Sequence, residues 1–235
     1  MLLRSTAVVG MMTLLSRILG LLRDILLAKY FGASGGTDAF FVAFKIPNFM
    51  RRLFAEGSFS QAFVPVFSEY KETRSRDDMV DLVNHVAGTL GVILLILSCI
   101  GMLAAPLMVM LFAPGFYDDP LRFQLTSDML AITFPYIFFI ALTAFAGGIL
   151  NSYQVFAVPA ITPVLLNLCM IAGAVFAADL FDTPIMALAW AVALAGLLQL
   201  LFQLPYLWKL GLLPRPRLKR HHEGVTKIMK LMLPS

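Results

Sequence analysis

The longest stretch of the chain without a charged residue or histidine runs from Met129 to Ala178 and covers 50 residues. A helix of about 20 apolar residues crosses the hydrocarbon core of a bilayer, because each residue rises about 1.5 Å. The stretch is too long for one crossing, and its segment 151–163, NSYQVFAVPAITP, supplies the prolines and polar residues typical of a turn. It therefore predicts two neighbouring membrane spans.

Composition extends this prediction to the whole chain. Hydrophobic residues make up 60% of the 235 residues and charged residues 14%, with a mean hydropathy of +0.84. A soluble domain of this composition would expose apolar patches that cause aggregation. We therefore predict an all-α membrane protein, a six-span helical bundle. The expected spans lie near residues 6–30, 38–66, 82–113, 128–150, 158–178 and 184–208.

Basic residues in the connections set the expected orientation, because lysine and arginine gather in cytoplasmic loops. They occur at the N-terminus and after the second and sixth predicted spans, as Arg4, Lys71, Arg74, Arg76, Lys209, Arg215, Arg217, Lys219 and Arg220. The opposite connections are glycine-rich or acidic and contain one basic residue, Arg122. The N-terminus is therefore expected in the cytoplasm, and residues 209–235 are expected to form a basic cytoplasmic loop and the start of a further helix.

The first 23 residues contain arginines and no acidic residue, a pattern that organelle transit peptides share. The apolar pattern continues through Asp24 into ILLAKYFGASGG without a small-residue cleavage site. We expect a retained first span, and a cleaved signal is the alternative.

Several other chemistries are not indicated. The net charge of +4 lacks the interleaved basic and aromatic residues of a nucleic-acid surface. Cys99 and Cys169 lie in apolar runs, which predicts buried thiols and no disulfide. His221, His222 and Glu223 could bind a metal in isolation, but their spacing favours a solvated basic loop. No catalytic motif is recognisable, so we expect no metal, no cofactor and no enzyme activity.

The first predicted span carries a polar face. Its residues recur at steps of four and three, as Thr6, Gly10, Thr13, Arg17, Gly20 and Asp24. Small residues are typical of a packing seam between helices. An arginine near the centre of a span, however, costs about 2.5–3.5 kcal/mol unless it faces water or a partner. Arg17 is the most central, Arg23 lies on a neighbouring stripe, and Asp24 can pair with Arg17 or with an arginine of another helix.

The second predicted span is interrupted and charged. Asp38, Lys45 and Arg52 recur at steps of seven, with Asn48 and Glu56 close to the same face. Pro47 removes a backbone donor and is expected to kink the helix. Such a helix typically lines a cavity. The alternative is that Arg52 and the adjacent Arg51 reach the cytoplasmic headgroups.

If both helices line one cavity, the cavity is electropositive and suits an anion. Guanidinium groups match phosphate oxygens in bidentate geometry, so a phosphate or pyrophosphate headgroup is the expected ligand. The predicted substrate-binding residues are Arg17, Arg23, Asn48, Arg51, Arg52 and Asn167, and the predicted gating or charge partners are Asp24, Asp38 and Glu56. For Asn167, as for Gln199 and Gln203, an interhelical hydrogen bond is the favoured explanation.

Four stretches also carry a family resemblance. They are SRILGLLRD at 16–24, TDAFFVAFKIPNFMRRLFAEGSFSQAFVPVFSEY at 37–70, APGF at 113–116 and FPYIFFIALTAFAGGILNSYQVFAVPAITPVLLN at 134–167. The chain resembles the MurJ (MviN) family of lipid II flippases, within the multidrug, oligosaccharidyl-lipid and polysaccharide exporter superfamily. The likeness covers almost the whole chain, and the second stretch is long enough to be specific.

The resemblance implies a two-lobed alternating-access transporter in the bacterial cytoplasmic (inner) membrane. Its substrate would be lipid II, the undecaprenyl-pyrophosphate-linked peptidoglycan precursor, moved from the cytoplasmic to the periplasmic leaflet. Family arginines match Arg17, Arg23 and Arg51 by motif position, and acidic residues match Asp24 and Asp38, with Glu56 in the FAEG stretch. The chain resembles the N-terminal lobe alone, so a C-terminal lobe is an expected partner for transport, besides membrane lipids.

Two other functions remain open at this stage. A non-transporting membrane scaffold, or a truncated fragment, would use the polar stripes for helix packing. A drug or cation antiporter of the same superfamily would favour acidic cavity residues, which is the opposite of the arginine-rich pattern seen in this sequence.

Overall fold

The computed structural model describes the backbone of residues 2–51, 58–218 and 222–232, and their side chains except at 2–6, 50, 51 and 58. The described residues are helical and contain no strand, which confirms the all-α class. In chain order the main helices are α1 (Leu2–Phe31), α2 (Gly35–Arg51), α3 (Ser58–Thr73), α4 (Arg76–Leu103), α5 (Ala105–Phe112), α6 (Pro120–Thr133), α7 (Tyr136–Ser152), α8 (Ala157–Ala160), α9 (Thr162–Ala172), α10 (Met186–Lys209) and α11 (Glu223–Met232).

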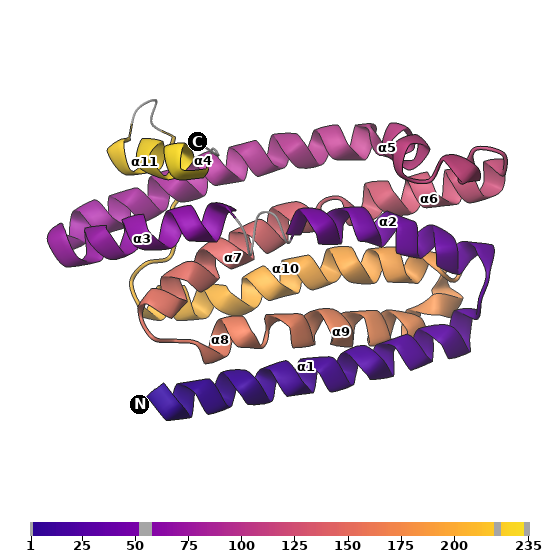
Figure 1. Ribbon diagram of the computed structural model, residues 1–235, viewed down its shortest axis with the longest axis horizontal. Coiled ribbons are helices and arrows are strands. Elements are labelled where there is room, and N and C mark those ends of the chain that lie inside the picture. Colours follow the sequence, from indigo (N-terminus) through magenta and orange to yellow (C-terminus); the bar gives the residue numbers. More distant parts are fainter. Residues whose placement is uncertain (1, 52–57, 219–221, 233–235) are drawn as a thin grey trace.

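The helices run back and forth along one long axis (Figure 1). Helix α10 packs between α7 and α9, and α1 packs on the outer side of α9. Helix α2 packs against α6 and α7, while α4 packs against α7 and α3. The N-terminus and α11 lie toward the same end of the bundle (Figure 1), which is the end expected to be cytoplasmic. This arrangement encloses polar side chains between α1, α2, α7, α9 and α10.

Four helical segments of the described residues are long and apolar enough to cross a membrane: Arg76–Leu103, Pro120–Ser152, Ala157–Leu180 and Met186–Lys209. They coincide with four of the predicted spans, those near 82–113, 128–150, 158–178 and 184–208. The prediction near 6–30 falls on α1, and the one near 38–66 falls on two helices, α2 and α3. The described part of the chain therefore forms more, shorter helices than the six predicted spans, and four helical segments in it are long and apolar enough to cross a membrane.

The difference has a physical cause in the charged and breaking residues of the first third of the chain. Helix α1 carries Arg17, Arg23, Asp24 and Lys29. Helix α2 has 17 residues, which is about 25 Å of helix and less than the roughly 30 Å hydrocarbon core. The charged residues lower the mean hydropathy of α1, and α2 is short, so neither helix is among the four membrane-length apolar segments.

Proline and capping residues explain the other boundaries. Helix α6 ends at Thr133 and α7 begins at Tyr136, because Pro135 between them has no backbone N–H to donate. The side chain of Asp119 accepts a hydrogen bond from the Arg122 backbone N–H at 3.1 Å and caps α6. Helix α4 begins with a reciprocal capping box between Ser75 and Asp78.

An aromatic cluster fixes α3 against α7 near the broken second span. Phe63 is fully buried and its ring lies 5.4 Å from the rings of Phe59 and Phe67 and 5.0 Å from that of Phe145. Close helix contact is also set by Gly101 of α4, where an added Cβ would lie 1.8 Å from the Phe134 ring. These contacts hold the helices that surround the polar cavity.

Large apolar side chains remain exposed along the outer faces of the bundle. On α1 they are Met11, Leu14, Ile18, Leu21 and Ile25, on α4 they are Leu95, Ile96, Ile100 and Leu103, and on α10 they are Trp190, Leu194, Leu198 and Leu201. A soluble protein does not leave such long apolar faces in water. The outer surface therefore fits hydrocarbon as its solvent. Cys99 lies on this exposed surface and Cys169 is half-buried, so the prediction of buried thiols is wrong for Cys99, because an apolar run faces lipid as well as the core.

The predicted start of a further helix corresponds to α11, which packs on α3 and α4. Lys227 Nζ pairs with Glu69 Oε2 of α3 at 2.5 Å, and Ile228 is buried. Burial, followed by the negative charge of Glu223, raises the pKa of Tyr70 above its ordinary value. Helix α11 is thus held against α3 and α4.

Candidate functional site

A polar cavity of about 630 Å³ lies between α1, α2, α3, α7, α9 and α10. Its polar lining comprises Arg23, Asn48, Ser60, Thr143, Asn151, Thr162, Asn167, Gln199 and Gln203. Three of the predicted substrate-binding residues, Arg23, Asn48 and Asn167, are thus brought together from three different helices. This volume is within the range of small-ligand sites.

Arg23 supplies positive charge to this cavity. Its Nη1 donates to Oδ1 of Asn167 at 2.9 Å. Its Nε and Nη2 donate to Oδ1 of the neighbouring Asp24 at 2.9 and 2.7 Å, so Asp24 pairs within its own helix and not with Arg17. The Arg23 side chain is 22% exposed and the Asp24 side chain 58%, so the carboxylate is not enclosed by other side chains. An incoming anion can therefore compete with Asp24 for the guanidinium donors.

Asn167 holds Arg23 in place. Its Nδ2 donates to the backbone carbonyl of Ser16 at 3.0 Å, while its Oδ1 accepts from Arg23. A carbonyl can only accept and a guanidinium can only donate, so the orientation of the amide is fixed. Asn167 is buried, and it bridges α9 to α1. The predicted interhelical hydrogen bond is confirmed, and the same residue lines the cavity.

Two glutamines form the α10 wall of the cavity. Gln199 Nε2 donates to the Thr162 carbonyl at 2.7 Å, and Gln203 Nε2 donates to Thr162 Oγ1 at 3.2 Å. Both predicted interhelical bonds are confirmed, and both side chains are fully buried. Within the described part of the chain, the Oε1 atom of each glutamine has no hydrogen-bond donor. The wall therefore presents amide groups in rigid positions.

The remaining predicted residues lie elsewhere or outside the described residues. Arg17 is exposed on α1 and does not line the cavity. Asp38 pairs with Arg122 Nη2 at 2.5 Å and so connects the first turns of α2 and α6. The side chain of Arg51, and Arg52 and Glu56 altogether, lie outside the described residues. The cationic pair at 51–52 is therefore not placed relative to Arg23.

Sequence analysis did not select the cavity residues of α7. They are Tyr136, Ile140, Thr143, Ala144, Gly147, Gly148 and Asn151. They recur every three or four residues, with adjacent pairs at 143–144 and 147–148, and so lie on one helical face; this spacing was the available signal. Gly147 and Gly148 have no side chain on this face, which leaves room for the cavity.

Long apolar helices with a polar-lined cavity between them define a multi-pass membrane protein. Comparison with known proteins makes this more specific. Residues 27–235 match the family described as "Lipid II flippase MurJ". The chain belongs to this family.

Individual relatives agree. The "Lipid II flippase MurJ" of Burkholderia cenocepacia is 46% identical over 236 residues, which cover 99% of this chain and 46% of the relative. The "Probable lipid II flippase MurJ" of Haemophilus influenzae is 46% identical over 231 residues, which cover 95% of this chain and 45% of the relative. That of Vibrio cholerae is 46% identical over 241 residues, with 100% and 46% covered.

A solved structure shares the fold. It is described as "Lipid II flippase MurJ, inward closed conformation", with a TM-score of 0.78 and 30% sequence identity. The match covers 95% of this chain and 45% of that chain. The chain therefore spans a little under half the length of the relatives it matches.

Proposed function

We propose that this chain is the N-terminal lobe of a lipid II flippase. In this proposal it carries the undecaprenyl-pyrophosphate-linked peptidoglycan precursor from the cytoplasmic to the periplasmic leaflet of the bacterial inner membrane. It is a transport protein and not an enzyme, it crosses the membrane six times, and its N-terminus is cytoplasmic. The observation that carries the proposal is the cavity of a MurJ family member, lined by Arg23, Asn48 and Asn167.

The proposed ligand of this cavity is the diphosphate of the substrate. Arg23 is held by Asn167 with its donors directed toward neighbouring acceptors, and the oxygens of a diphosphate can replace the single carboxylate oxygen of Asp24 that these donors now share. When the diphosphate binds, Arg23 exchanges Asp24 for a phosphate oxygen. Asn48 and Asn167 supply uncharged contacts beside it.

The other arginines are proposed to extend the cationic region. Arg17 lies six residues before Arg23, about 9 Å along the axis of α1. In this proposal Arg17, Arg51 and Arg52 draw the headgroup toward Arg23. Their guanidinium groups stay charged at any physiological pH, so capture does not depend on protonation.

The acidic residues are proposed to act on the conformational cycle. The ion pair of Asp38 with Arg122 joins α2 to α6, at the end of the bundle expected to be periplasmic. We assign it the role of a latch between open states, with Glu56 as a further charge partner. Alternating access requires two bodies that rock against each other, so a second lobe is a required partner in this proposal.

Photocrosslinking tests the ligand. A photoreactive residue at position 48, inside the cavity, should capture a lipid-linked pyrophosphate in bacterial membranes. The matched control is position 100 on the outer face of α4, where Ile100 is exposed to lipid. Equal labelling by bulk phospholipid at both positions would contradict a substrate site in the cavity.

Complementation tests the two-lobe requirement. Cells depleted of their own flippase should grow when this chain is supplied together with the C-terminal half of the Vibrio cholerae relative, and should not grow with either half alone. Unimpaired growth with both Arg23→Glu and Arg17→Glu introduced would favour a scaffold instead of a transporter.

A further inference from the structure

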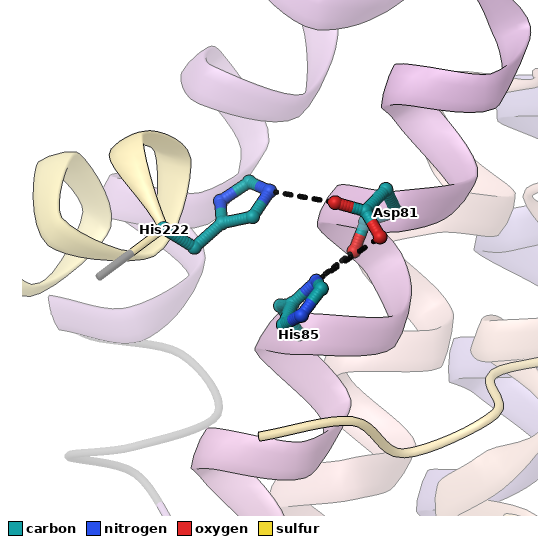
Figure 2. A group of neighbouring side chains, drawn as sticks. All are labelled: Asp81, His85 and His222. Atoms are coloured by element: carbon teal, nitrogen blue, oxygen red, sulfur yellow. Dashed lines mark hydrogen bonds and ion pairs between the residues drawn. The ribbon is translucent and has the colours of Figure 1, made fainter. Parts of the chain in front are cut away.

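Three side chains with metal-binding atoms meet at the end of the bundle that holds α11. Asp81 and His85 are four residues apart on α4 and so share one helical face. His222 comes from the segment that directly precedes α11, far away in the sequence. Figure 2 shows the two imidazole rings and the carboxylate turned toward one another. The function proposed above does not use this group.

The distances between the ligand atoms suit a small metal ion. His85 Nδ1 lies 3.3 Å from Asp81 Oδ1, and His222 Nε2 lies 3.4 Å from Asp81 Oδ2. One ligand atom from each of the three residues lies within 4.8 Å of the others. Ligands bound to a tetrahedral zinc ion at about 2.0–2.2 Å lie about 3.3–3.5 Å apart. Each imidazole nitrogen therefore already lies at about this distance from Asp81, but each from a different carboxylate oxygen. Rotation of the rings and of the carboxylate would bring one ligand atom of each residue around a single ion.

The surroundings favour nitrogen and oxygen ligation and give a cation access. The His85 and His222 side chains are 8% and 11% exposed, whereas that of Asp81 is 40% exposed. Asp81 borders a second cavity of about 730 Å³ that Asp77 and Asp78 also line. Arg215 and Arg217 also line this cavity. It gives a cation a path to the Asp81 carboxylate, and water from it can complete the coordination.

Tertiary contacts hold the ligands in place without a metal. The backbone N–H groups of Arg215 and Arg217 donate to Oδ1 and to the carbonyl oxygen of Asn84, at 2.7 and 3.0 Å, so the chain before His222 is fastened along α4. The imidazole rings of His85 and His222 are stacked with centroids 4.9 Å apart. His85 Nδ1 lies 2.8 Å from the Asp81 carbonyl oxygen. The fold therefore already restricts the motion of these side chains, which lowers the entropy cost of binding a metal ion.

We propose that Asp81, His85 and His222 form a binding site for a divalent transition-metal ion of the zinc type, which fastens the start of α11 to α4. Imidazole and carboxylate are ligands that zinc accepts, with solvent in the fourth position. Metal binding replaces the His85 hydrogen bond to the Asp81 carbonyl and the hydrogen bond that His222 Nδ1 accepts from the Val225 N–H, and it shifts the proton of each ring to its other nitrogen. Arg217 Nη1, 3.9 Å from Asp81 Oδ1, opposes the cation but is 62% exposed and free to turn into solvent. The site is therefore expected to be weaker than a four-ligand structural zinc site.

Zinc titration of the whole chain in detergent tests the proposal. After treatment with a chelator, the protein should bind one zinc ion in calorimetry, and zinc should raise its unfolding temperature. Asp81→Asn, His85→Gln and His222→Gln should each weaken binding at least tenfold. Arg217→Gln should strengthen it, because the opposing charge is removed.

Matched controls come from the sequence beside His222. His221→Gln and Glu223→Gln should leave zinc affinity within twofold of the unchanged protein. Loss of binding in these two variants but not in Asp81→Asn or His85→Gln would overturn the site and assign the metal to residues 221–223.

Cobalt gives a readout that does not depend on stability. Co²⁺ bound to the unchanged chain should produce the visible absorption of a tetrahedral or five-coordinate site, and His222→Gln should remove it. His222 precedes the first residue of α11, and its Nδ1 accepts a hydrogen bond from the Val225 backbone N–H. The side-chain oxygen of the glutamine in His222→Gln can accept the same bond, so this variant is expected to fold. A featureless spectrum in the unchanged protein, or no zinc binding at all, would refute the proposal.

Discussion

The bond between Arg23 and Asn167 allows a quantitative test of the cavity geometry. Replacement of Asn167 by leucine keeps the side-chain size but removes the acceptor for Arg23 Nη1 and the donor to the Ser16 carbonyl. A hydrogen bond to a charged group contributes about 1.5–3 kcal/mol and a neutral one about 0.5–1.5 kcal/mol. Because Arg23 is partly hydrated by the cavity, the low ends of both ranges apply. We expect Asn167→Leu to lower the free energy of unfolding by about 2 kcal/mol.

A double-mutant cycle isolates the part that belongs to Arg23. Arg23→Gln and Asn167→Leu should show a coupling energy of about 1.5 kcal/mol, measured by equilibrium unfolding in mixed micelles. The matched control pairs Asn167→Leu with Arg122→Gln at the opposite side of the bundle, where the two effects should add within about 0.5 kcal/mol. Coupling near zero between positions 23 and 167 would refute the geometry. A coupling as large in the control cycle would show a general effect on folding.

Two further predictions concern the frame around the cavity. Gly101→Ala should destabilise the protein by about 3 kcal/mol, because the new methyl group would lie 1.8 Å from the buried ring of Phe134. Gly91→Ala on the same helix is its control and should be neutral or stabilising, because nothing lies within 4 Å of the added atom; equal losses of unfolding temperature in both would contradict the argument. Asp38→Asn should lower the free energy of unfolding by at most about 1 kcal/mol, since the Asp38 side chain is 61% exposed. The effect should vanish in an Arg122→Gln background, and an undiminished effect in that background would show that the ion pair is not its source.

The sequence alone determined the class of the protein. The 60% hydrophobic content and the uncharged run from Met129 to Ala178 indicate a membrane protein, because a soluble domain of this composition would expose large apolar patches. The polar residues noted in the first span include Arg23, which lines the cavity, and the amide at Asn167 was correctly expected to bond another helix. These results depend on local composition and helical periodicity, which are properties of neighbouring residues in the chain.

Periodicity could not distinguish Arg17 from Arg23. Both belong to the polar part of α1, and the one that faces the cavity is set by the side of α1 that packs on α9. The partner of Asp38 was equally hidden, since Arg122 had been noted only for its place in a predicted outer loop. Hydropathy also counted six spans where the backbone forms shorter helices, because an average over many residues does not detect a break such as the one at Pro135.

The tertiary structure alone brought together Asp81, His85 and His222. In the sequence, His222 stands beside His221 and Glu223, and that local trio suggests a different group of ligands from the one that the fold assembles. Helix periodicity relates residues three and four apart, but it carries no information on contacts between α4 and the segment before α11. Such contacts follow from the packing of whole helices, which depends on side-chain shape at every interface and not on the pattern within one segment.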